Sequence, residues 1–137
     1  METKGTNLFI VDDNKLLVID LKNYLQTRFG TSLEISTFYD GESCLKKIDH
    51  TTHIVILDYF LDGKNGLEVL KAIKDINKKT EVIMLSNNED VAIAIETFRF
   101  GAKDYVIKGD NYYKKIIKLV NVMITKPFRI TVKGFFR

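Results

Sequence analysis

Five polar side chains stand directly after short apolar runs of this sequence, and their types suit the chemistry of a phosphoryl group. They are Asp12 and Asp13 after LFIV, Asp58 after IVIL, Ser86 after VIML and Lys108 after YVI. Carboxylates that lie close together repel each other, and a divalent cation such as Mg²⁺, which prefers oxygen ligands, relieves that repulsion. A carboxylate beside such an ion can attack an electrophilic phosphorus, while a hydroxyl and an ammonium bind the phosphoryl oxygens. These residue types therefore indicate phosphoryl transfer to an aspartate.

Apolar runs rich in Ile, Val and Phe alternate along the chain with segments that have helical spacing. Short apolar runs predict strands, and apolar residues at every third or fourth position predict amphipathic helices. Strands alternating with helices predict an α/β domain in which a mostly parallel sheet has helices on both faces. The expected strands are residues 8–11, 33–38, 54–57, 82–85 and 105–107. The expected helices lie around residues 18–29, 45–48, 69–76, 91–98 and 116–124.

The five polar residues follow four of these strands, and ligands of such sheets bind at the carboxyl ends of the strands. We therefore expect them to meet at one edge of the sheet. Taken singly, each has a plainer interpretation. Asp13 or Asn14 could cap the first helix, Asp58 could start a turn, Ser86 could cap the fourth helix and Lys108 could be an exposed charge. Their joint occurrence at strand ends favours a site.

Composition is that of one globular domain. The chain has 137 residues, of which 45% are hydrophobic and 28% charged, enough to bury a core. Its single cysteine, Cys44, cannot form an internal disulfide and is interpreted as a packed side chain, and no apolar run approaches the ~18 residues of a membrane span. The start METKGTNL lacks the pattern of a signal peptide. We expect a cytoplasmic protein without a membrane span.

The net charge of +3 is concentrated at the C-terminal end. All 18 acidic residues and 17 of the 21 basic residues lie in residues 1–125, so that this part is nearly neutral. Charge therefore gives no basis for nucleic-acid binding. We divide the sequence into a domain at residues 1–125 and a basic tail at 126–137, with Pro127 at the boundary. Because apolar and polar residues alternate over 128–133, a solvated terminus, an extra strand, an oligomer contact and the start of a missing effector domain all remain open.

Taken in order, the motifs resemble a response-regulator receiver domain of bacterial two-component signalling. The resemblance covers about residues 7–125. It rests on the acid pair, on LDYFLDGKNGLEVL, in which Gly66 follows Asp58 by eight positions, on Ser86, and on GAKDYVIK, which contains Tyr105 and Lys108. It implies a doubly wound, flavodoxin-like α/β fold with five helices and a five-stranded parallel sheet in the order 2-1-3-4-5.

The resemblance also implies a role for each site residue. Asp58 would be the phosphoacceptor, supplied by a sensor histidine kinase or a phosphotransfer protein. Mg²⁺ would be held by Asp12, Asp13, Asp58 and the backbone carbonyl of Phe60. Ser86 and Lys108 would bind the phosphoryl group, and Tyr105 would switch with Ser86. The domain would catalyse only its own phosphorylation and dephosphorylation, so that it would not be an enzyme in the ordinary sense.

The expected output surface is formed by the fourth helix, the fifth strand and the fifth helix. In the fourth helix we expect Val91, Ile95 and Phe98 to face the core, which leaves Ile93 and Phe100 as surplus apolar residues. The fifth helix has more apolar residues than one face needs, and homodimerisation or cover by the tail would explain them. The sequence does not identify the output partner.

Three other functions are weaker interpretations. A haloacid-dehalogenase phosphatase requires a second aspartate where Phe60 stands. A flavin mononucleotide carrier requires a phosphate loop where the acid pair would repel phosphate. A pseudo-receiver that acts without phosphorylation, as an interaction module, is the alternative that remains. Four features depart from the family pattern. Gly109 replaces the usual proline after Lys108, and Asn87 is larger than the small residue common after Ser86. Leu61 and Asp62 stand where methionine and proline are common.

Overall fold

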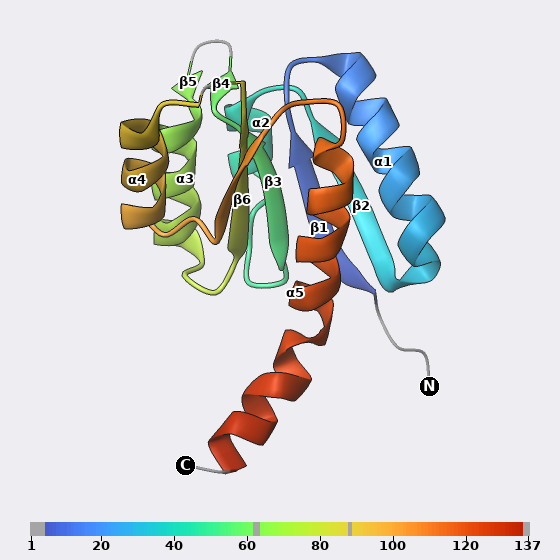
Figure 1. The fold of residues 1–137 in the computed structure, drawn as a ribbon. Coiled ribbons are helices and arrows are strands. Elements are labelled where there is room, and N and C mark those ends of the chain that lie inside the picture. Colours follow the sequence, from blue (N-terminus) through green and yellow to red (C-terminus); the bar gives the residue numbers. More distant parts are fainter. Residues whose placement is uncertain (1–4, 62–63, 88, 136–137) are drawn as a thin grey trace.

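The computed structural model describes residues 5–61, 64–87 and 89–135, and it has a central sheet between two layers of helices (Figure 1). The strands of the central sheet are β1 (Thr6–Val11), β2 (Leu33–Phe38), β3 (Ile54–Asp58), β6 (Glu81–Ser86) and β7 (Asp104–Ile107). A small hairpin consists of β4 (Phe60–Leu61) and β5 (Lys64–Asn65). The α-helices are α1 (Lys15–Phe29), α2 (Gly41–Leu45), α3 (Gly66–Ile76), α4 (Val91–Arg99) and α5 (Tyr112–Phe135), and a 3₁₀ turn spans Gly30–Ser32.

All neighbouring strands of the central sheet are parallel, in the order β2-β1-β3-β6-β7. The predicted order 2-1-3-4-5 is therefore confirmed, since β6 and β7 are the fourth and fifth strands of this sheet. The chain reverses its winding direction after β2, which leaves a switch point between β1 and β3. Ligands of open α/β sheets bind beside such a point, at the carboxyl ends of the strands.

Side chains alternate between the two faces of each strand, and both faces are buried. On one face, Ile10 and Ile56 pack with α1 and α5. On the other, Val11 and Leu57 pack with α2 and α3. This two-sided burial explains why the central strands are continuous apolar runs, and Figure 1 shows α1 and α5 on one side of the sheet with α3 and α4 on the other.

Helix α4 is rotated relative to the sequence-based expectation. The stripe predicted to face the core is largely exposed: Val91 by 68%, Ile95 by 53% and Phe98 by 46%. Thr97 is instead fully buried, and Ile93 packs against the core beside it. The Thr97 hydroxyl donates to the Ile93 carbonyl at 2.8 Å, which satisfies its polar group and lets a threonine face the core. The prediction was wrong because it assumed that the most apolar stripe of the helix is the one that faces the core.

Helix α5 continues through Pro127 to Phe135, so the extra strand, one of the alternatives left open for the tail, is not formed. An alternating segment needs a neighbouring strand to pair with, and α5 continues past the lower end of the sheet (Figure 1). Hydrogen bonds within a helix satisfy the backbone there. Residues 136 and 137 of the tail lie outside the described residues, and the division into domain and tail remains a prediction. Within the described part of the chain, no helix has the length and apolar character needed to cross a membrane.

Candidate functional site

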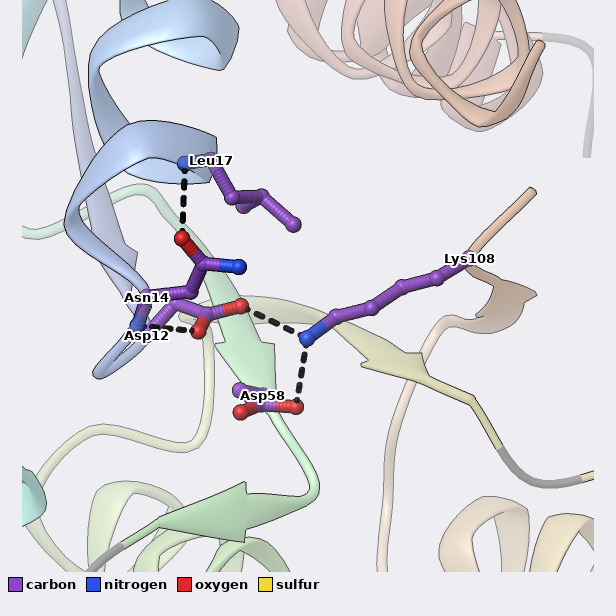
Figure 2. Close-up of polar contacts among 5 residues, drawn as sticks. All are labelled: Asp12, Asn14, Leu17, Asp58 and Lys108. Atoms are coloured by element: carbon purple, nitrogen blue, oxygen red, sulfur yellow. Dashed lines mark hydrogen bonds and ion pairs between the residues drawn. The ribbon is translucent and has the colours of Figure 1, made fainter. Parts of the chain in front are cut away.

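The Lys108 ammonium lies between two buried carboxylates at the carboxyl edge of the sheet (Figure 2). Its Nζ is 3.0 Å from Oδ2 of Asp12 and 3.3 Å from Oδ1 of Asp58. Asp58 ends β3 and Asp12 follows β1, the strand paired with β3. Lys108 follows β7 at the far end of the same edge, two strands from β3. Three segments distant in sequence thus meet as the strand ends predict.

Asp13 completes a group of three carboxylates. One oxygen each from Asp12, Asp13 and Asp58 lie within 4.8 Å of one another. Asp12 and Asp58 are 1% and 4% exposed, whereas Asp13 is exposed to solvent. Ligand oxygens of an octahedral Mg²⁺ are at most ~4.2 Å apart, given bonds of ~2.1 Å. The donor set therefore fits a hard divalent ion after a small contraction, with room for water on the exposed side.

Burial and the nearby charge of Asp12 both disfavour the ionised form of Asp58. Removal from water, followed by the charge of Asp12, raises the pKa of Asp58 to about 6, although Lys108 opposes this shift. The backbone N–H of Phe60 also donates to the Asp58 carboxylate. Burial alone would lower the pKa of Lys108, but its hydrogen bonds and ion pairs with Asp12 and Asp58 outweigh burial and raise that pKa. One ammonium does not fully neutralise the group, which leaves a favourable place for a cation.

The start of α1 shows which residue caps the helix and which residue belongs to the carboxylate site. The cap of α1 is Asn14, whose side-chain oxygen accepts from the Leu17 N–H at 3.2 Å. The Asn14 N–H in turn donates to Oδ1 of Asp12 at 2.9 Å and orients that carboxylate (Figure 2). Capping is therefore carried out by Asn14, and Asp13 lies with the carboxylate group.

The loop after Asp58 is fixed by backbone hydrogen bonds on both sides. The Tyr59 N–H donates to the Leu85 carbonyl at 2.9 Å, and the Tyr59 carbonyl accepts from the Gly66 N–H at 2.6 Å. Phe60 forms the hairpin strand β4, with its ring largely exposed and edge-on to Tyr59. Its backbone is thus next to the acid group, and the role of its carbonyl as a metal ligand remains a prediction.

Ser86 lies at the carboxyl end of its strand, as predicted, and Tyr105 lies within the neighbouring strand. Ser86 is the last residue of β6 and is fully buried, and its carbonyl accepts from the Lys108 N–H at 2.8 Å. Tyr105 lies in β7, paired with Met84, and is 7% exposed. The backbone contact couples the segment carrying Ser86 to the lysine, while phosphoryl binding by Ser86 and switching by Tyr105 remain predictions.

Tyr112 at the start of α5 is a neighbour of the site that the sequence did not reveal. It is half-buried, and burial, followed by the charges of Asp20 and Asp12, raises its pKa to about 12. Tyr112 and Tyr113 are edge to face, and Tyr113 stacks on Tyr24 of α1 at a centroid distance of 4.1 Å. No motif or spacing marks Tyr112, because its proximity to the acid group depends on how α5 docks beside α1.

The comparisons with known proteins agree on one family of similar proteins. The family model of the response regulator receiver domain matches residues 8–121. The transcriptional regulatory protein MalR of Bacillus subtilis is 33% identical over 104 residues, which are 74% of this chain and 43% of MalR. The response regulator ArlR of Staphylococcus aureus is 26% identical over 124 residues, 89% of this chain and 54% of ArlR. The chain thus spans about half the length of the curated relatives it matches.

Solved structures agree with the fold. The BeF3-activated DrrB receiver domain superposes with a TM-score of 0.78 at 28% identity, over 88% of this chain and 97% of that domain. A CheY-like response regulator receiver domain protein from Methanospirillum hungatei has a TM-score of 0.80 over 92% of this chain and 99% of its own, at 18% identity. The second match bears on the fold alone.

Proposed function

Because the chain belongs to the response regulator receiver domain family of two-component signalling, we propose that it accepts a phosphoryl group on Asp58 in a Mg²⁺-dependent reaction. The observation that carries this proposal is the Lys108 ammonium within 3.3 Å of both Asp12 and Asp58, beside three carboxylate oxygens that lie within 4.8 Å of one another. A nucleophile, a cation for the phosphoryl group and ligands for a divalent ion are thus adjacent.

The proposed donor is the phosphohistidine of a sensor histidine kinase or of a phosphotransfer protein. An oxygen of the ionised Asp58 attacks phosphorus, the P–N bond breaks, and the histidine nitrogen takes up a proton from solvent. A bound Mg²⁺ would neutralise the phosphoryl oxygens and keep Asp58 ionised. Lys108 donates to the same oxygens, and the buried site limits the water that could reorganise around them. Hydrolysis of the resulting acyl phosphate reverses the signal.

Phosphorylation replaces one carboxylate by a group with about two negative charges and several acceptor oxygens. Ser86 and Lys108 lie on adjoining segments, joined by the backbone hydrogen bond between them, so a shift of either toward the phosphoryl group moves both. Tyr105 belongs to β7, and its side chain packs in the core on the side of α2 and α3, so that it would respond to such a shift. We propose that α4, β7 and α5 present this change to a partner.

We propose that the output partner is another protein, a second copy of this chain in a homodimer included. The outward stripe of α4 places Val91, Ile95 and Phe98 on the proposed output surface, and Ile107 of β7 is also exposed. The relatives named above are longer than this chain, and MalR carries the description of a transcriptional regulatory protein. Control of transcription is thus one output that we propose for this receiver domain.

Intact-mass spectrometry after incubation with acetyl phosphate tests the proposal. We expect the wild type to gain one phosphoryl group with Mg²⁺ and none in EDTA, and Asp58→Asn to gain none. Asp49→Asn, an exposed aspartate of a distant loop, is the matched control and should be phosphorylated like the wild type. Phosphorylation of Asp58→Asn would disprove the assignment of the acceptor. A wild type that stays unmodified with Mg²⁺ would favour the pseudo-receiver alternative.

A further inference from the structure

A cavity lies at the opposite edge of the sheet from Asp58, where the strands begin. Its volume is about 870 Å³, a size typical of small-molecule sites. Five separate segments line it: the start of β1 at Thr6, the loop at residues 50–54, the turn at 74–81, the loop at 101–103, and one face of α5 at Met123 and Ile124. None of the proposed phosphorylation residues takes part, so that this cavity is distinct from the site described above.

The lining of this cavity is strongly basic although the body of the chain is nearly neutral. Among the described residues that line it, Lys74, Lys78, Lys79 and Lys103 are cationic, two are histidines, and Glu81 is a carboxylate. The carboxyl edge of the same sheet carries the three aspartates. The two edges therefore have opposite charge, and an anion repelled by the metal-free acid group is attracted to the amino edge.

Hydrogen bonds between loops hold the lining in place. The Thr80 hydroxyl donates to the Thr52 carbonyl at 2.8 Å in a buried contact, and the Asn77 amide donates to the Asp49 carbonyl at 3.2 Å. These bonds join the turn at residues 77–80 to the loop at 49–52. Because both segments are already ordered, a ligand would lose little binding energy to ordering them.

Two cavity residues have their orientation fixed by neighbours. The backbone N–H of Asn7 donates to Nδ1 of His53 at 2.9 Å, so that the neutral imidazole carries its proton on Nε2 and retains that N–H as a donor. The Lys74 ammonium donates to the carbonyls of Thr80 at 2.6 Å and Lys78 at 3.3 Å. Lys74 thus braces the turn, while the side chains of Lys78, Lys79 and Lys103 are exposed and accessible to a ligand.

We propose that this cavity binds a small organic anion of about mononucleotide size. Lys78, Lys79 and Lys103 would neutralise a multiply charged phosphate or carboxylate group. The buried side chains of Ile54 and Ala102, with Met123 and Ile124 of α5, provide apolar lining for the rest of the molecule. Such a ligand would contact β3, β6 and α5 together, all of which also extend to the phosphorylation edge.

Amide NMR of the whole chain tests this site. Pyrophosphate, citrate and adenosine diphosphate are titrated separately in EDTA at constant ionic strength. We expect saturable shifts confined to residues 50–54, 77–81 and 101–104, with adenosine diphosphate about tenfold tighter than pyrophosphate because it adds apolar surface. Tighter binding of pyrophosphate than citrate would identify a phosphate ligand, and the reverse order a carboxylate. Shifts that grow without saturation, or that spread over all lysines, would overturn the proposal.

A charge-matched pair of variants separates the site from net charge. Lys78→Glu combined with Lys103→Glu should weaken binding at least about tenfold. Lys22→Glu combined with Lys118→Glu changes the net charge equally on α1 and α5, outside the cavity lining, and should leave the affinity within about twofold. Equal weakening by both pairs would contradict a specific site. All four substitutions lie away from Asp58, so phosphorylation by acetyl phosphate measures the proposed function independently.

Discussion

Gly66, the first residue of α3, lies so close to the backbone of Asp58 that no side chain fits between them. A Cβ added to Gly66 would be 2.5 Å from the Asp58 carbonyl oxygen and 2.7 Å from the Tyr59 Cα. Real Cβ atoms do not approach backbone this closely, so that any larger residue must displace α3 or the segment that carries the proposed phosphoacceptor. The glycine that follows Asp58 by eight positions thus has a steric function in positioning the site.

Gly66→Ala should reduce both stability and phosphorylation. We expect a loss of about 1–3 kcal/mol in the free energy of unfolding from overpacking, and a slower phosphoryl gain from acetyl phosphate because Asp58 moves relative to Lys108. Urea unfolding and intact-mass time courses measure the two effects. Gly109→Ala is the matched control, because a Cβ there has no heavy atom within 4 Å. Equal behaviour of the two variants would refute the steric argument.

Asp58→Asn should stabilise the metal-free protein at neutral pH. The pKa of Asp58 is about 6 in the folded protein against a reference of 3.8, so that folding favours the protonated carboxyl. The resulting penalty is absent below about pH 4, develops as the pH rises to about 6, and persists at pH 7, where it is at most about 3 kcal/mol.

Thermal unfolding in EDTA between pH 4 and pH 8 checks this prediction. The melting temperature of Asp58→Asn should exceed that of the wild type at pH 7, and the gap should close toward pH 4. Mg²⁺ should then stabilise the wild type more than the variant. Asp75→Asn removes the same charge from an exposed position of α3 and should change little. A difference in melting temperature, Asp58→Asn minus wild type, that increases toward pH 4 would show that the pKa of Asp58 is lowered, and not raised, by folding.

Asn87→Ala should speed phosphorylation by acetyl phosphate. Asn87 follows Ser86 directly at the carboxyl end of β6 and is exposed, so that its side chain can narrow the approach to Asp58. We expect the rate to rise at least about twofold, which corresponds to ~0.4 kcal/mol of barrier. Asn23→Ala, on the exposed surface of α1, is the control. An unchanged rate for Asn87→Ala would exclude steric hindrance by this side chain.

Ile95→Ser should be nearly neutral for stability, because the side chain of Ile95 faces outward on α4. We expect a change of less than about 0.5 kcal/mol in the free energy of unfolding. Ile73→Ala, at a fully buried position of α3, should cost about 2–5 kcal/mol. Urea denaturation compares the two variants. A cost of several kcal/mol for Ile95→Ser would indicate that Ile95 faces the core, as expected from the sequence, and would contradict its outward orientation on α4.

Cys44 should be unreactive in the folded protein. Burial, followed by the charge of Asp40, raises the pKa of its thiol to about 12, and the thiolate is the form that reacts. At pH 8 only about one molecule in ten thousand would carry the thiolate. We expect alkylation by iodoacetamide to be at least about a hundredfold slower in buffer than in urea, as followed by intact mass. Similar rates would indicate that α2 opens readily.

The sequence alone determined the layered fold and which residues come together at the acid site. The two-sided burial of β1, β3 and β6 is visible as continuous apolar runs, since each residue's hydrophobicity reports its own environment. The polar residues at the ends of those runs had to meet, because parallel strands place their carboxyl ends at one edge. Asp12, Asp58 and Lys108 were therefore predictable before any contact was known.

Only the tertiary structure decided the features that depend on how the helices are rotated and docked against the sheet. Sequence periodicity shows that α4 has an apolar stripe, but the buried face is the one with Thr97, whose hydroxyl is satisfied by the Ile93 carbonyl of the same helix. The same holds for Asn14, which caps α1 in place of Asp13, and for Gly66, whose importance comes from a distance to Asp58. The basic cavity at the amino edge combines five segments without a shared motif. Its charge follows from proximity in space, a property that local sequence does not encode.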